Sequence, residues 1–133
     1  MDLQPTVRDV RPASDRSWLA SPPNSDAVLD TLAITLDGDE FDVQDFPGGV
    51  VPAGTVIGRL TASGLGGPYD HDGSDGLDTA VGHVLTDVTV SAGRTATVAL
   101  VTKGRIFTGR LPVNSGWHGD VPADLPLIQY DGD

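Results

Sequence analysis

The sequence contains no cysteine, which excludes disulfides, thiolate nucleophiles and cysteine-based zinc sites. Lysine and glutamate occur once each, at Lys103 and Glu40, although long helices normally use both residues often. No hydrophobic run approaches membrane-spanning length, and the N-terminal stretch "MDLQPTVRDVRP" lacks the apolar core of a signal peptide. We therefore expect a soluble protein that is made without secretion.

Basic side chains are also scarce, since 8 Lys and Arg residues stand against 19 Asp and Glu residues and the net charge is −11. Binding to phosphate groups requires a basic face, so neither nucleic acid nor an anionic membrane is an expected partner. The length of 133 residues suits a single domain.

The residues that are abundant indicate an all-β fold. Glycine and proline together account for 27 of the 133 residues, and valine and threonine, which favour strands, are frequent. The patterns predict strands over 29–37, 55–62 and 79–90 and a hairpin of 95–102 with 105–111, turned at Lys103-Gly104. Near the end, one helical turn capped by Asp120 precedes a last strand through Leu127, Ile128 and Tyr130.

The N-terminal part differs from the rest of the chain. Residues 1–36 are expected to form an extended arm, rich in proline, and residues 37–133 the β-rich domain. Trp18 and Leu19 form an isolated apolar pair within this arm. Further on, Leu32, Ile34 and Leu36 alternate with smaller or polar residues, which is typical of a half-buried strand.

The loop "GLGGPYDHDGSDGLD" carries the residues that most resemble a functional site. Asp70, Asp72 and Ser74 have the spacing of a calcium loop, but Asp75 and Val81 stand where that loop needs a glycine and a glutamate. The histidines, His71, His83 and His118, lack paired metal-ligand spacing, and no nucleophile–base pair is recognisable. We therefore predict no catalytic, cofactor-binding or metal-binding residue, no cofactor and no enzyme activity. The loop is expected to be a hydrated connector, and its neighbours Val56, Ile57, Leu60, Val81, Val84 and Leu85 are expected to be core.

Several short motifs in one order give the chain a family resemblance. The stretch "VPAGTVIGRLTASGLGGPYDHDGSDGLDTAVGHVLTDV", followed by "VALVTKGRIFTGRLP", resembles the head decoration proteins of tailed bacteriophages, the lambda-like family. "DRSWLAS" and "ADLPLIQY" look like forms of that family from phages of actinobacteria. The resemblance implies a compact β-clip-like or small-barrel domain with an extended N-terminal arm.

The same resemblance implies a structural role without catalysis. A decoration protein of this kind binds the major capsid protein on the outer surface of the mature head, as trimers at three-fold and quasi-three-fold positions. It stabilises the shell against the pressure of packaged DNA. The chain would be synthesised in the host cytoplasm and located on the outer surface of the virion.

The apolar residues of the arm are the expected capsid contacts. Trp18 and Leu19 would insert into a groove of the capsid protein, and Leu32, Ile34 and Leu36 would lie along a strand of the shell. Alternatively, Trp18 packs on its own β domain. Two other functions stay open: a virion or tail module that binds another structural protein or a host glycan, and a small acidic hydrolase or calcium-binding module.

Overall fold

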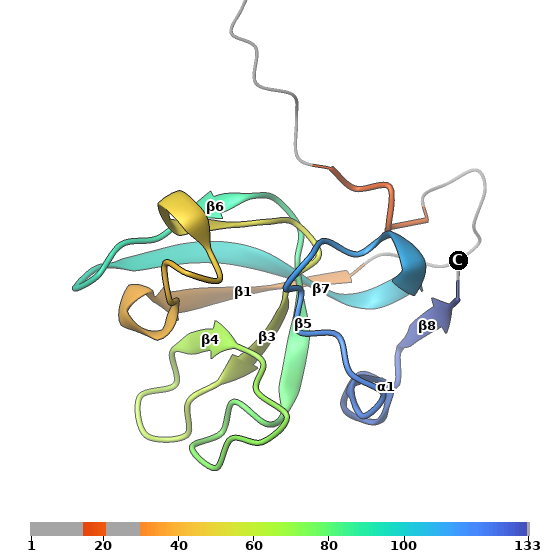
Figure 1. Cartoon of the computed structure of the whole chain (residues 1–133). Coiled ribbons are helices and arrows are strands. Elements are labelled where there is room, and N and C mark those ends of the chain that lie inside the picture. The colour runs from red at the N-terminus through yellow and green to blue at the C-terminus, as the bar shows by residue number, and fades with distance from the viewer. Residues whose placement is uncertain (1–14, 21–29, 133) are drawn as a thin grey trace, which may run out of the picture.

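The chain forms a small closed β-barrel, seen in a computed structural model that describes residues 15–20 and 30–132 (Figure 1). Its strands follow the order β1–β4–β3–β5–β7, and the ring closes because β1 also pairs with β7. The barrel strands are β1 (Asp30–Asp37), β3 (Val56–Arg59), β4 (Gly66–Pro68), β5 (Ala80–Val84) and β7 (Thr95–Phe107). The predicted all-β fold with a compact small-barrel domain is confirmed.

Shorter elements surround this barrel. β8 continues the sheet beyond β7 in parallel orientation, and β2 pairs with β6 in a separate ribbon. These elements are β2 (Val50–Val51), β6 (Val88–Thr89), β8 (Ile128–Asp131), the helical turn α1 (Val121–Asp124) and three 3₁₀ turns, η2 (Gly38–Glu40), η3 (Pro47–Gly49) and η4 (Thr108–Arg110). Within the described ranges, no helix is long and apolar enough to cross a membrane.

Two hydrophobic clusters cover the two faces of the β3–β5–β7 sheet. Because successive side chains of a strand point to opposite faces, Val56 and Ile57 fall into different clusters, as do Leu100 and Val101. The barrel cluster comprises Ile34, Leu36, Phe41, Phe46, Val51, Ile57, Val84, Val90 and Leu100. The outer cluster comprises Trp18, Ala53, Val56, Tyr69, Ala80, Val101, Ile106, Val121, Leu125 and Ile128.

The predicted hairpin at Lys103-Gly104 is wrong, because β7 runs without a turn through both residues. Its first part pairs with β1 and its last part, from Gly104 onwards, pairs with β8. Gly104 has a φ of 150°, a value that side-chain-bearing residues rarely adopt, at the point where the partner changes. Pairing with distant strands therefore outweighs the local turn signal of a lysine–glycine pair.

β1 is an integral strand of the barrel. It lies antiparallel to β7 from Asp30↔Lys103 to Asp37↔Thr95, and Ile34 and Leu36 are buried inside. The boundary predicted between residues 36 and 37 therefore falls within β1. One edge of β1 is therefore paired along its whole length within the domain, and its other edge pairs with β4 at Leu36↔Gly66.

Other local predictions were met in part. Of the residues predicted as core next to the acidic loop, Val56, Ile57 and Val84 are fully buried and Leu60, Val81 and Leu85 are half-buried. The loop itself contains the short strand β4, which its glycine-rich sequence does not signal. α1 follows Asp120 as predicted, but the Asp120 side chain makes no capping hydrogen bond. The last strand begins at Ile128, and Leu127 is exposed.

Candidate functional site

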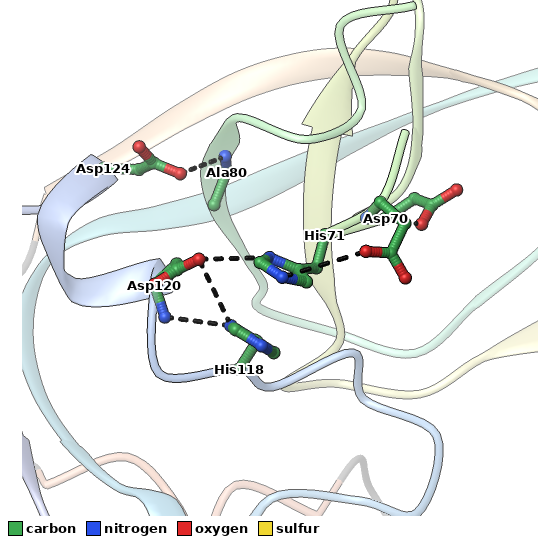
Figure 2. Close-up of polar contacts among 7 residues, drawn as sticks. Asp70, His71, Ala80, His118, Asp120 and Asp124 are labelled. Carbon is green, nitrogen blue, oxygen red and sulfur yellow. Dashed lines mark hydrogen bonds and ion pairs between the residues drawn. The ribbon is translucent and has the colours of Figure 1, made fainter. Parts of the chain in front are cut away.

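His71, from the β4–β5 loop, meets His118 and Asp120, from the segment that leads into α1 (Figure 2). Oδ2 of Asp120 lies 3.1 Å from Nδ1 of His71 and 3.7 Å from Nδ1 of His118. The two imidazole rings stack, with centroids 3.7 Å apart and planes inclined by 16°. Both histidine side chains are a little over 40% exposed. Solvent and ions can therefore reach the cluster.

Backbone hydrogen bonds hold the two loops that carry this cluster. The β4–β5 loop is closed by Asp70 N–H donating to the Leu77 carbonyl at 2.9 Å. On the other side, Val121 N–H donates to the His118 carbonyl at 3.0 Å as α1 begins. A side-chain bond also joins the two segments, since Ala80 N–H donates to Oδ2 of Asp124 at 3.0 Å (Figure 2). The cluster therefore sits on constrained backbone.

The sequence does not predict this cluster, because metal sites are recognised in a sequence by ligand pairs at short spacing. His71 and His118 are 47 positions apart, and only the packing of the β4–β5 loop against the segment before α1 brings them together. Within residues 15–20 and 30–132, it is the one group of three or more histidine, aspartate or glutamate side chains close enough to share a metal ion. Asp70, the first residue of the calcium-like spacing, instead stabilises the loop, because its Oδ1 accepts a hydrogen bond from the backbone N–H of Asp72 at 3.1 Å.

A groove of about 390 Å³ lies beside the cluster and is acidic. Its lining includes the carboxylates of Glu40, Asp42, Asp45 and Asp70, with Phe46, Pro68, Tyr69, Leu77, Asn114, Ser115 and Gly116. Burial, and then the charge of nearby aspartates led by Asp37, raises the pKa of Glu40. This concentration of negative charge disfavours an anionic ligand.

The segment around Trp18 is docked on the domain. The Trp18 side chain is 1% exposed within the outer cluster, and its Nε1 donates to the Asp15 carbonyl at 2.8 Å. Its backbone carbonyl accepts from Phe107 N–H at 2.7 Å, and Leu19 forms a β-bridge with Ile106. The structure thus places Trp18 where the alternative interpretation put it, on its own domain.

The other predicted capsid contacts differ in exposure. Leu19 is half-buried against the outer cluster, whereas Ile34 and Leu36 are 4% and 0% exposed inside the barrel. Leu32 is 44% exposed and is therefore the large apolar residue of β1 that solvent reaches. Residues 1–14 and 21–29 of the predicted arm lie outside the described residues.

His83 is fully buried and takes part in the core rather than in a site. Its Nδ1 lies 2.9 Å from the Gly54 carbonyl, which can only accept, so Nδ1 carries the proton. Nε2 then accepts from the Tyr130 hydroxyl at 2.8 Å. Burial lowers the pKa of His83 to about 4, although the hydrogen bond to Gly54 opposes the shift. His83 is thus a buried residue of β5.

Comparison with known families gives a match across the barrel. Residues 44–123, more than half of the chain, match the family model described as bacteriophage lambda head decoration protein D. The matched range covers β2 to β7 and both loops of the histidine cluster. The comparison with curated proteins gave no match.

Proposed function

Because the chain belongs to the bacteriophage lambda head decoration protein D family, it is a phage head decoration protein, and we propose how it binds the head. The family is structural, and membership implies a virion protein that binds the capsid. We propose that it sits on the outer surface of the mature shell, in contact with the major capsid protein, and acts there without catalysis. The family match over residues 44–123 carries this proposal.

We propose further that copies assemble as trimers at the three-fold and quasi-three-fold positions of the shell and stabilise it against the pressure of packaged DNA. Three copies of a chain with a net charge of −11 would carry −33, which is unfavourable beside DNA. This charge supports an outward orientation of the acidic groove. It also opposes association in solution, so the trimer would form on the capsid.

The N-terminal segment is our candidate for the capsid contact. Leu32 and Leu19 have exposed surface that can meet a partner, whereas Trp18, Ile34 and Leu36 would have to leave the core first. We therefore assign Trp18 the role of an anchor that fixes residues 1–14 to the domain. Residues 1–14, Leu19 and Leu32 would contact the capsid, and Ile34 and Leu36 would support Leu32 from within the barrel. Such contacts would link neighbouring capsid subunits.

A deletion of residues 1–14 tests this arrangement, because it leaves every described contact of Trp18 in place. We expect the truncated protein to keep its melting temperature and to lose most of its binding to expanded, undecorated capsids. Bound copies are counted by cryo-electron microscopy, with the full-length chain as the control. Unchanged occupancy would show that the binding surface lies on the barrel, and copies on the inner wall would refute the proposed orientation.

A further inference from the structure

The separations between donor atoms in the histidine cluster suit a small ion. In a tetrahedral site with metal–ligand distances of about 2.0–2.1 Å, neighbouring donors are roughly 3.3 Å apart. The two measured separations, 3.1 Å from Asp120 Oδ2 to His71 Nδ1 and 3.7 Å to His118 Nδ1, lie on either side of that value. All three donor atoms lie within 4.8 Å of one another.

The donor types narrow the class of ion. Two imidazole nitrogens and one carboxylate oxygen suit zinc and similar divalent transition metals. Calcium and magnesium prefer oxygen donors, and calcium takes six to eight of them. The site also lies in a strongly acidic part of the surface, where Asp70 and Asp72 flank His71. That negative charge attracts any cation, so the preference for a transition metal over calcium or magnesium must come from the two imidazoles.

We propose that His71, His118 and Asp120 form a binding site for a divalent transition metal of the zinc class. Nδ1 of each histidine and Oδ2 of Asp120 would be the ligands, and water would complete the coordination. The ion would replace the hydrogen bond that Asp120 N–H donates to His118 Nδ1 at 3.1 Å. Because the lone pair of an imidazole nitrogen lies in the ring plane, the two rings would turn out of their near-parallel stack to bind the ion, each through a deprotonated nitrogen.

Such an ion would join two segments that are distant in the sequence and adjacent in the fold. One ligand comes from the β4–β5 loop and two come from the segment that leads into α1. The Asp124–Ala80 bond already links the same regions, so the metal would add a second connection between them. A metal-bound chain should therefore resist unfolding better, because the ion binds the folded state preferentially.

Zinc chloride titrated into the purified full-length chain, followed by calorimetry, tests the site directly. We expect one ion per chain and no comparable binding of magnesium. At roughly a hundredfold excess of zinc over its dissociation constant, the melting temperature should rise by about 5–10 °C. Cobalt(II) should give the visible absorption of a nitrogen- and oxygen-ligated ion.

Matched variants separate this site from diffuse attraction to the acidic surface. His71→Ala, His118→Ala and Asp120→Asn should each weaken zinc binding at least about tenfold. Asp78→Asn removes one negative charge, as Asp120→Asn does, but from the β4–β5 loop that carries His71 and outside the cluster, and it should leave the affinity for zinc within about twofold. Circular dichroism checks that each variant is folded.

Three outcomes would overturn the proposal: no saturable zinc binding, equal affinity in the histidine variants, or equal losses in Asp78→Asn and Asp120→Asn. Because all measurements use the free chain, they are independent of capsid binding. Failure of the metal site would therefore leave the decoration function untouched.

Discussion

The indole ring of Trp18 stacks on the imidazole ring of His83, with centroids 6.1 Å apart and planes inclined by 28°. This contact joins a residue from the start of the described chain to barrel strand β5. His83 in turn bonds to Gly54 and Tyr130, so one buried polar group connects three other parts of the chain. The N-terminal segment is therefore held by the core of the domain.

Replacing Trp18 by alanine should destabilise the free protein. The side chain is 1% exposed, and removing a buried tryptophan costs about 3–5 kcal/mol through lost burial and the cavity left behind. The free energy of unfolding in urea measures the loss. Ser17→Ala is the matched control, because Ser17 is exposed beside it, and should change stability by less than about 0.5 kcal/mol. A Trp18→Ala protein as stable as the wild type would refute the anchor.

The stability of the domain should fall in mild acid because of His83. Its pKa is about 4 in the folded state and about 6.5 when unfolded, so the unfolded chain takes up a proton first as the pH drops. The contribution is fully present above about pH 6.5, decreases toward pH 4, and amounts to about 3 kcal/mol. Urea unfolding measured across this range checks the slope.

A glutamine at position 83 removes the titration and separates it from that of the carboxylates. His83→Gln should unfold with a flatter pH dependence between about pH 6.5 and 4, whatever its stability at neutral pH. The double variant His71→Asn, His118→Asn should retain the steep dependence, because it leaves His83 and its hydrogen bonds to Gly54 and Tyr130 in place. Equal slopes in the wild type and His83→Gln would contradict the buried, neutral state of His83.

The sequence predicts the class of fold better than its connections. Alternating apolar residues in β1 and the scarcity of helix-forming residues were enough to indicate strands and a small all-β domain. The hairpin at Lys103-Gly104 failed because strand partners are chosen by long-range packing, which a local turn signal does not report. The sequence does not predict β4 either, because its glycines are required by close packing with distant residues: Gly66 lies against Leu36, and Gly67 lies against Glu40 and Leu77.

The candidate site was less predictable than the fold. The spacing of His71, His118 and Asp120 carries no metal signature, and their proximity arises only when two loops pack together. Trp18 was noticed in the sequence, but its role was ambiguous. An isolated tryptophan among prolines fits both an exposed capsid contact and a residue buried in its own domain. In the structure the indole is buried against His83, and Gly54 leaves room for it, which distinguishes the two.

Gly54 should not tolerate even a methyl group. Its φ of 101° strains any other residue, and a Cβ atom there would lie 3.0 Å from Nε1 of Trp18 and 2.8 Å from Cδ of Pro112. We expect Gly54→Ala to lose about 2–4 kcal/mol of stability, from backbone strain and overpacking together. Gly64→Ala is the control, since Gly64 also has a positive φ but nothing within 4 Å of its Cβ position. Equal losses in both variants would show that Trp18 does not pack as described.

The last prediction separates capsid binding from folding within β1. Leu32 and Ile34 share a face of the strand, but Leu32 is 44% exposed and Ile34 is 4% exposed. If β1 contributes to the capsid contact, Leu32→Ser should weaken binding to expanded capsids about tenfold and lower the stability of the free protein only slightly. Ile34→Ser should instead cost about 3 kcal/mol in stability, because it puts a hydroxyl and a cavity into the barrel.

Val113 provides the matched control for Leu32. It is 86% exposed and lies outside the N-terminal segment, so Val113→Ser removes an exposed apolar side chain without affecting that segment. Thermal melts and capsid titrations of the three variants then give distinct patterns. A loss of capsid binding in Val113→Ser with none in Leu32→Ser would move the contact from β1 to the segment before α1. A loss in Leu32→Ser alone, at unchanged melting temperature, would support a capsid contact through β1.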